Sequence, residues 1–287
     1  MRLPLRVRLL NFFRRIWMVG PLESWLAKHT IGKAPDNFLC KLVPNPYQYP
    51  RPSFRAVERS GVRMKVDVSD YMGHYFYFGF DDPSNQALFS LVKETTRIVD
   101  VGANIGWTAL WMAAHAKNGW VMAFEPDAVN YQRCMENIRL NGFRNIQLFQ
   151  TALGNRTDEV KMEVRTSWNL GGNRVAPGNA TGNPAVVNRL DGVLNQFPDQ
   201  NIELIKIDVE GYELEVLRGA AQLLERAKPV LFIELDDNNL RDHGSSAADL
   251  VRFLETKGYA SIVEAVNRVP VSSAQSFENC HIDIIAS

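Results

Sequence analysis

The 287-residue chain has little cysteine and no excess of either charge. Its three cysteines, Cys40, Cys134 and Cys280, are far apart and form no CxxC pair. This excludes a disulfide framework and a thiolate zinc site, and it indicates a reducing, cytoplasmic location. The 32 basic residues balance 32 acidic ones, which argues against a nucleic-acid-binding protein. There is no run of about 20 apolar residues, so we expect no membrane-spanning helix.

The first 20 residues are basic and amphipathic. They contain five arginines and no acidic residue. The arginines interrupt every apolar run, which argues against a signal peptide. One interpretation is a helix that rests on the inner face of an anionic membrane. The other is a helix that docks on its own domain or on a second subunit of a homo-oligomer. In either case one helical face would carry five apolar residues: Leu5, Leu9, Phe12, Phe13 and Ile16.

Five prolines between residues 35 and 52 predict an irregular connector after this arm. We therefore expect an N-terminal arm over 1–55 and one main domain over 56–287. Within residues 56–96 the pattern predicts a hairpin, with strands at 63–68 and 75–80, and then a helix with Ser84 as its N-cap.

From residue 97 onward, predicted strands alternate with predicted helices. Repeated units of this kind predict an α/β fold with a doubly wound, mostly parallel, Rossmann-like sheet. The last two strands, close in sequence, predict an antiparallel hairpin at one edge. Residues 167–184, rich in glycine and asparagine, predict a long loop. The expected strands are 97–101, 120–124, 147–149, 203–207, 230–235, 261–264 and 281–285, and the expected helices are 107–115, 128–141, 211–225 and 247–257.

The first candidate site is a glycine turn after the strand at 97–101. Gly102 lets the backbone approach a ligand, and the carboxyl end of this strand is where open α/β sheets bind ligands. About 20 residues later, Glu125 follows the next strand, where an acid accepts hydrogen bonds from ribose hydroxyls. A structural alternative is that Glu125 only offsets a helix dipole. Asn104 replaces the second glycine of GxGxxG, and Asp100 suits a cationic ligand, so S-adenosylmethionine is favoured over NAD.

The second candidate site is the segment IKIDVEGYE, in which Asp208 and Glu210 follow an apolar strand. Residues two apart in a strand share a face, and two neighbouring carboxylates raise each other's proton affinity, so that one can act as a base. The alternative is that they cap the following helix. Glu234, at the end of the next strand, is a further candidate, with Asp236 beyond it.

Together these segments resemble a known family. VDVGANIGWTAL, AFEPDAVNYQRCMENIRLNG, LIKIDVEGYELEVLRGA and PVLFIEL, with VNRLD at 187–191, are similar to the FkbM family of S-adenosylmethionine-dependent methyltransferases over about residues 85–260. The resemblance implies a class I methyltransferase fold and methyl transfer to a hydroxyl oxygen. It implies that Asp100, Gly102, Asn104 and Gly106 line the methionine end of the cofactor and that Glu125 binds the ribose. It also implies that Thr151 and Ala152 lie beside the adenine and that Asp208 and Glu210 face the transferred methyl group and the acceptor.

Some related enzymes use a divalent metal, for which Asp208 with Glu234 or Asp236 would be ligands; the sequence shows no complete ligand set, so a metal is not favoured. Our first hypothesis is an O-methyltransferase acting on a small molecule, sugar or glycolipid. The alternatives are an NAD-dependent oxidoreductase and a non-catalytic, membrane-associated binding module with the same fold.

Overall fold

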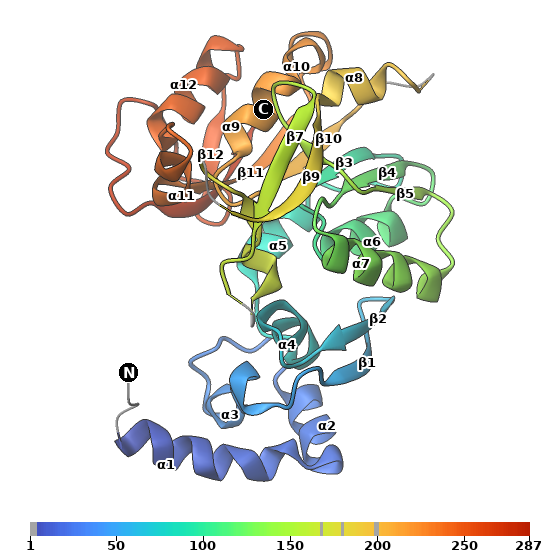
Figure 1. Cartoon of the computed structure of the whole chain (residues 1–287), viewed down its shortest axis with the longest axis vertical. Helices are drawn as coiled ribbons and strands as arrows, with labels where there is room; N and C mark the ends of the chain where they lie inside the picture. The colour runs from blue at the N-terminus through green and yellow to red at the C-terminus, as the bar shows by residue number, and fades with distance from the viewer. Residues whose placement is uncertain (1–4, 167–168, 179–180, 198–200) are drawn as a thin grey trace. The chain divides into compact units, whose positions relative to one another are not determined.

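The computed structural model describes residues 5–166, 169–178, 181–197 and 201–287 (Figure 1). The chain forms two compact units: Met1–Pro83 with Thr166–Gly171, and Ser84–Arg165 with Gly172–Ser287. The division after Pro83 lies beyond the boundary expected near residue 55. No helix in the described residues is long and apolar enough to cross a membrane.

The N-terminal unit consists of short helices and one hairpin. Glu23 and Arg55 form an ion pair of 2.6 Å, and the Arg59 guanidinium donates to the carbonyls of Ala27 and Tyr77. These contacts attach the hairpin to the arm, which is why the unit continues to Pro83. The elements are α1 (Leu5–Arg14), the 3-10 helix η1 (Arg15–Met18), α2 (Gly20–His29), α3 (Phe38–Leu42), the 3-10 helix η2 (Pro46–Gln48), β1 (Phe54–Arg59), β2 (Val62–Asp67) and α4 (Tyr71–Phe78).

The prediction of a strand at 75–80 is wrong, because residues 75–78 belong to helix α4. The Asp70 carboxylate accepts from the backbone N–H groups of Met72 and Gly73 and so caps the helix, and Gly79 ends it in left-handed backbone at φ 62°. The run of aromatic residues favours a strand by propensity, but burial of neighbouring aromatic side chains around a helix outweighs it. The hairpin instead pairs β1 with β2.

The N-cap expected at Ser84 is also wrong. Ser84 is the second residue of α5 (Pro83–Phe89), because Pro83 suits the first helical position. Its hydroxyl donates instead to the Asp283 carboxylate.

The larger unit contains a seven-stranded sheet in the order β12-β13-β11-β10-β3-β4-β5. The five strands β11, β10, β3, β4 and β5 are parallel to one another. Strand β13 is antiparallel to both of its neighbours, β11 and β12. The predicted Rossmann-like sheet with an antiparallel edge hairpin is confirmed. The strands are β3 (Arg97–Val101), β4 (Trp120–Phe124), β5 (Ile146–Phe149), β10 (Leu204–Ile207), β11 (Val230–Asp236), β12 (Ile262–Glu264) and β13 (His281–Ala286).

Helices cover both faces of this sheet (Figure 1). Alternate residues of a strand point to opposite faces. Ile98 accordingly packs in one apolar cluster with α5 and α6, and Val99 and Val101 pack in another with α8, α9, α10 and α12. The helices are α6 (Trp107–His115), α7 (Ala128–Asn141), α8 (Leu190–Leu194), α9 (Glu213–Gly219), α10 (Ala221–Ala227), α11 (Asp237–Asp242) and α12 (Ala247–Thr256).

The helix expected over 211–225 is two helices, α9 and α10, which meet at Ala220. The Asp191 carboxylate accepts from the backbone N–H groups of Gln222 and Leu223, both at 3.1 Å, and so caps α10 separately. A Cβ on Gly219 would lie 1.9 Å from the carbonyl oxygen of Gly154, so the chain bends where only glycine fits.

A second, four-stranded sheet occupies part of the loop expected at 167–184. Its order is β6-β9-β7-β8. Pairing with β7 draws residues of low strand propensity into the ladder, which sequence periodicity does not show. Residues 167–168 and 179–180 of the expected loop lie outside the described residues. The elements are β6 (Ala152–Leu153), β7 (Asp158–Glu163), the 3-10 helix η3 (Leu170–Gly172), β8 (Arg174–Val175) and β9 (Asn183–Asn188).

Candidate active site

The glycine turn joins β3 to α6 and lies directly against the end of β10. Gly102, Asn104 and Gly106 all have positive φ, at 82°, 51° and 93°. The backbone N–H groups of Gly102 and Ala103 both donate to the Phe124 carbonyl at 3.0 Å. A Cβ on Gly102 would lie 1.9 Å from the carbonyl oxygen of Asp208, so only glycine permits this approach. The turns that follow β3, β4 and β10 therefore converge.

Glu125 ties the turn after β4 to the glycine turn. Its carboxylate accepts from the backbone N–H of Asn104 at 2.8 Å and from that of Asp127 at 2.9 Å. Burial raises the pKa of Glu125 to about 7, although these two N–H groups oppose the shift. The capping of α7 is performed by Asp127, which accepts from Val129 and Asn130. Asp127 is therefore the side chain that caps α7, and Glu125 connects the turn after β4 to the glycine turn.

A buried lysine lies behind both turns. The Lys206 Nζ is 3.3 Å from Asp100 Oδ1 and 3.4 Å from Asp208 Oδ2, and it donates to the Gly102 carbonyl at 2.8 Å. Burial alone would lower the pKa of Lys206, but the two carboxylates outweigh it and raise the pKa. Lys206 thus holds the β3 and β10 ends together by charge.

Asp100 has no exposed surface. Its other carboxylate oxygen accepts from the Thr108 hydroxyl at 2.7 Å. The structure therefore places Asp100 behind the turn, between Lys206 and Thr108. Sequence reasoning missed Lys206, although a single lysine within the apolar strand LIKI was the available signal.

The turn after β10 carries Asp208 and Glu210. Since β10 ends at Ile207 and Glu210 has a left-handed φ of 57°, the argument that the pair shares one face of a strand does not apply. Neither residue caps α9 as the structural alternative required. Glu213 serves this turn instead, because it accepts from the backbone N–H groups of Val209 and Gly211.

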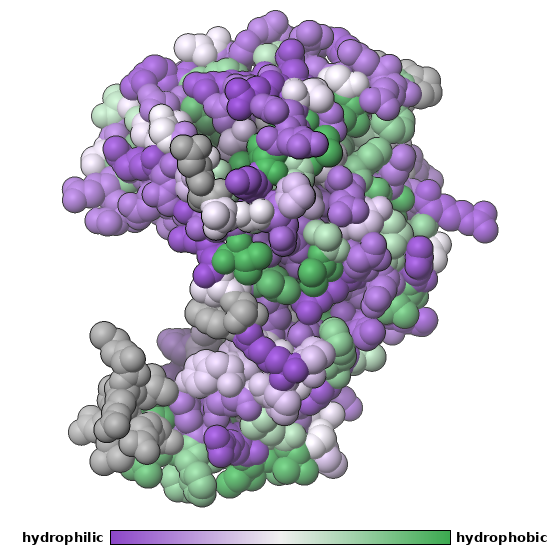
Figure 2. Space-filling view, viewed as in Figure 1, coloured by the Kyte–Doolittle hydropathy of each residue, from purple (hydrophilic) through white to green (hydrophobic). Residues whose placement is uncertain are grey.

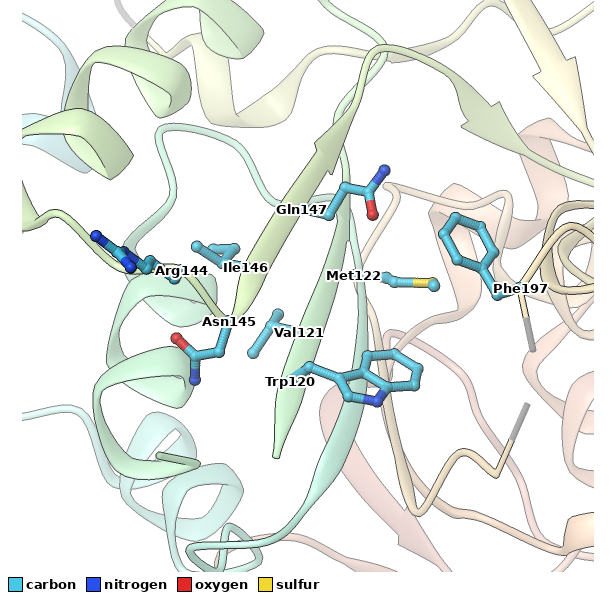
Figure 3. A pocket seen from close by; sticks show the side chains of 8 residues that line it. All are labelled: Trp120, Val121, Met122, Arg144, Asn145, Ile146, Gln147 and Phe197. Atoms are coloured by element: carbon cyan, nitrogen blue, oxygen red, sulfur yellow. The ribbon is translucent and has the colours of Figure 1, made fainter. Parts of the chain in front are cut away.

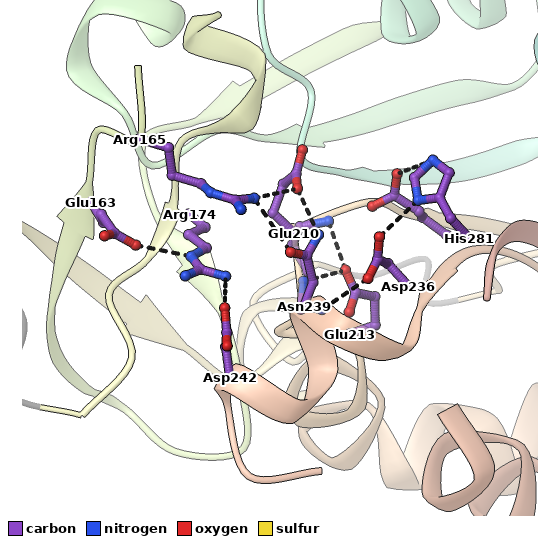
Figure 4. A network of polar contacts seen from close by, with 12 residues as sticks. Glu163, Arg165, Arg174, Glu210, Glu213, Asp236, Asn239, Asp242 and His281 are labelled. Carbon is purple, nitrogen blue, oxygen red and sulfur yellow. Dashed lines mark hydrogen bonds and ion pairs between the residues drawn. The ribbon is translucent and has the colours of Figure 1, made fainter. Parts of the chain in front are cut away.

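Glu210 is held by two side chains from other elements (Figure 4). Its carboxylate accepts from the Asn239 side-chain amide at 2.9 Å and lies 3.5 Å from an Arg165 guanidinium nitrogen. Burial, followed by the charge of Asp208, raises the pKa of Glu210, and Arg165 opposes the shift. Sequence reasoning missed Arg165 and Asn239, which are far from the motif in the chain and show no spacing that predicts their contact with it.

Glu234 stands opposite Asp283 on neighbouring strands β11 and β13. Burial raises the pKa of Glu234 well above its ordinary value, and the charges of Asp208 and Glu210 add to the shift. Its Oε2 is buried and has no hydrogen-bond partner among the described residues. Burial also raises the pKa of Asp283, to about 6. Asp236 lies two residues after Glu234, at the end of β11, where its side chain caps α11 and contacts His281.

Thr151 and Ala152 follow β5 and are both buried. The Thr151 hydroxyl donates to the Val186 carbonyl at 2.8 Å and accepts from the Asn188 amide at 3.0 Å. These bonds attach the smaller sheet to the end of β5.

A second ion-pair network lies beside Glu210 (Figure 4). The nearly buried Arg174 of β8 bonds Glu163 of β7 at 2.9 Å and Asp242 of α11 at 2.8 Å. It thereby connects the smaller sheet to the helix that carries Asn239.

A cavity of about 470 Å³ lies elsewhere (Figure 3). Trp120 and Ile146, the first residues of β4 and β5, are among its lining residues. It therefore opens at the amino ends of these strands, whereas the motifs follow their carboxyl ends, and we do not assign it to the site. Within the described ranges, no group of three or more His, Cys, Asp or Glu side chains is arranged to hold a metal ion.

Comparison with known proteins identifies related methyltransferases. The chain is 26% identical over 201 residues to Methyltransferase 1 of Beauveria bassiana, covering 60% of this chain and 76% of that protein. It is 26% identical over 171 residues to the 2-O-methyltransferase NoeI of Sinorhizobium fredii, covering 54% and 69%. The crystal structure of methyltransferase FkbM from Methylobacillus flagellatus aligns at 19% identity with a TM-score of 0.45, over 76% of this chain and 55% of that one.

A family model described as the methyltransferase FkbM domain matches residues 100–261. The match begins at the buried Asp100 and takes in both turns, Glu125 and Glu234. Since it spans more than half of the 287 residues, the chain belongs to the FkbM methyltransferase family.

Proposed function

We propose that this protein transfers a methyl group from S-adenosylmethionine to a hydroxyl oxygen of a small molecule, sugar or glycolipid. The observation that carries the proposal is the convergence of three strand ends, at which Gly102 lies against Asp208 and Glu125 bonds the backbone of Asn104. Open α/β sheets bind ligands at such an edge. The relationship to NoeI, a 2-O-methyltransferase by name, supports oxygen as the acceptor atom.

The residues at the glycine turn fit S-adenosylmethionine. The buried Asn104 Oδ1 has no hydrogen-bond partner among the described residues and is an acceptor suited to an ammonium group. Each Glu125 oxygen accepts only one backbone N–H, so each keeps a lone pair for a ribose hydroxyl. Gly102 and Gly106 complete the surface toward the methionine end.

The adenine is assigned to Thr151 and Ala152, beyond Glu125 on the same edge of the sheet. Asp100 is assigned a positioning role. It fixes Lys206, and Lys206 in turn fixes the Gly102 carbonyl and the Asp208 carboxylate.

Asp208 and Glu210 are assigned to the acceptor. Glu210 is the stronger candidate for the base, because its raised pKa brings its proton affinity closer to that required near neutral pH. Arg165 and Asn239 orient its carboxylate. The Asp208 side chain is 45% exposed and is placed to accept a hydrogen bond from the acceptor. Glu234, whose raised pKa favours the neutral form, is a hydrogen-bond donor behind them.

When bound, S-adenosylmethionine supplies an electrophilic methyl carbon. The work left to the protein is to hold the acceptor oxygen in line with that carbon and to accept the hydroxyl proton. We assign these two functions to the two carboxylates on the β10 turn.

Calorimetric titration with S-adenosylmethionine, S-adenosylhomocysteine and NAD tests the cofactor. We expect the first two to bind and NAD not to bind. Binding of NAD alone would favour an oxidoreductase, and failure of all three would favour a non-catalytic module. A screen of sugars, glycolipids and small alcohols with methyl-labelled cofactor then identifies the acceptor, and labelling confined to nitrogen or carbon would overturn the O-methyltransferase proposal.

A further inference from the structure

The N-terminal arm attaches to its own unit through polar groups. Asn11 of α1 donates from its amide to the Tyr47 hydroxyl at 2.9 Å, and its backbone carbonyl accepts from the Gln48 amide at 2.8 Å. Arg14 donates to the Lys41 carbonyl at 2.8 Å. The side of α1 that faces the rest of its unit is thus its polar side.

The opposite side of α1 is apolar and exposed. Leu9, Phe12 and Phe13 of α1 and Ile16 of the following η1 have the i, i+3, i+4, i+7 spacing of one helical face, and each is between 53% and 66% exposed. Val19 and Trp25 extend this surface toward α2. Figure 2 shows hydrophobic residues along the lower edge of the N-terminal unit, where Figure 1 places α1 and α2. A surface helix of a soluble domain has the reverse arrangement, with its apolar face inward.

The charge around this surface has one sign. Residues 1–22 contain five arginines and no acidic residue. The first acidic residue, Glu23, is buried in its ion pair with Arg55 and presents no free charge. Trp25 stacks between Trp17 and His29, with ring centroids 5.9 Å and 4.1 Å away. Indole rings next to arginines are typical of helices at a membrane surface.

We propose that this arm surface, made by Leu9, Phe12, Phe13, Ile16, Val19 and Trp25, binds the face of an anionic lipid bilayer, with α1 lying in the plane of the interface. The apolar side chains would enter the acyl boundary while the exposed Arg15 contacts anionic headgroups. A second copy of the chain fits less well, because a two-fold contact would bring together two copies of a segment, residues 1–22, that is basic and has no acidic residue. The inference does not depend on the proposed methyl transfer.

Vesicle sedimentation with the full-length protein tests the proposal. We expect binding to phosphatidylcholine vesicles containing 30% phosphatidylglycerol to be at least ten-fold stronger than to phosphatidylcholine alone, and to weaken with salt. The double variant Phe12→Ser/Phe13→Ser should lose at least ten-fold in binding, and Arg15→Glu should weaken it as well. The control Val266→Ser/Val269→Ser, at two exposed valines of the larger unit, should bind like the wild type.

Equal melting temperatures of the variants would show that folding is intact. Three results would overturn the proposal: a wild-type protein that stays in the supernatant with anionic vesicles, a Phe12→Ser/Phe13→Ser variant that binds as well as the wild type, or a solution dimer that this variant dissociates. Membrane binding by a protein that fails to bind S-adenosylmethionine would support this inference while rejecting the proposed function.

Discussion

Lys206 and Asp100 stand opposite each other on the adjacent parallel strands β10 and β3, with Nζ and Oδ1 3.3 Å apart and neither side chain more than 5% exposed. A buried ion pair of this kind contributes little net stability as a pair, but loss of one partner leaves the other charge unpaired in the interior. We therefore expect a substitution of only one of the two residues to destabilise the protein.

We predict that Lys206→Met lowers the free energy of unfolding by about 3–5 kcal/mol, because Asp100 would remain buried without its cation. The double variant Asp100→Asn/Lys206→Met should be less destabilised than Lys206→Met alone. Urea unfolding measures both. Lys161→Met, at an exposed lysine of β7, is the control and should change stability by less than about 0.5 kcal/mol. A Lys206→Met protein as stable as this control would contradict the network.

We predict that affinity for S-adenosylhomocysteine rises as the pH increases from 6 to 8. The pKa of Glu125 is about 7, and only its ionised form accepts hydrogen bonds from ribose hydroxyls at both oxygens. Glu125→Gln should lose about 1–3 kcal/mol of binding at pH 8 and lose the pH dependence. Calorimetry over this pH range measures it. Unchanged affinity in the variant would remove Glu125 from the cofactor site.

We predict that Glu213 makes the protein less stable as the pH rises from about 4.5 to 7. Burial raises the pKa of Glu213 from 4.5 to about 7, so in this window the unfolded chain has released the proton while the folded protein retains it. Each rise in pH therefore favours unfolding, and the contribution becomes constant above pH 7. Glu213→Gln should reduce the slope of the free energy of unfolding against pH between about 4.5 and 7. Glu215→Gln, on the same helix, should leave that slope unchanged. Equal slopes for Glu213→Gln and the wild type would refute the assignment.

We predict that Glu210→Gln lowers kcat by about 10²–10⁴-fold with the acceptor found by screening, because the group that removes the hydroxyl proton is lost. Binding of S-adenosylhomocysteine should change less than two-fold. Asp208→Asn should likewise reduce turnover more than cofactor binding. A fully active Glu210→Gln enzyme would rule out its role as the base.

We predict that Arg165→Ala shifts the acidic limb of the kcat/KM pH profile of the same reaction to higher pH. Arg165 opposes the rise in the pKa of Glu210, so its loss lets that pKa increase further. Arg165→Lys should restore most of the wild-type profile. A profile that keeps its shape while its height falls would indicate a structural role only.

The arrangement of the large sheet was predictable, because the pattern of apolar residues, caps and glycines within each segment indicates its strands and helices. Apolar strands such as β3 and β4 alternate with capped helices, and Gly102 marks the turn between them. The helix α4 was not predictable in this way, because its aromatic run satisfies the statistics of a strand and only the Asp70 cap and tertiary burial decide for a helix. The four-stranded sheet depends on pairing between segments with weak propensity of their own.

The same distinction applies to the site. The positions of Glu125 and Asp208 near one another were predictable, since both residues follow strands whose carboxyl ends meet. The partners Arg165, Asn239 and Asp283 come from other elements and show no periodicity or spacing relative to the motifs. The contact of Lys206 with Asp100 was not predictable, because the register that pairs the two residues appears only when the two strands lie side by side.

Arg174 couples the smaller sheet to the helix that contacts Glu210. Arg174 forms an ion pair with Asp242 at the end of α11, and Asn239 of the same short helix donates a hydrogen bond to Glu210. A displacement of β8 is therefore expected to move α11, and with it the Asn239 amide that bonds Glu210.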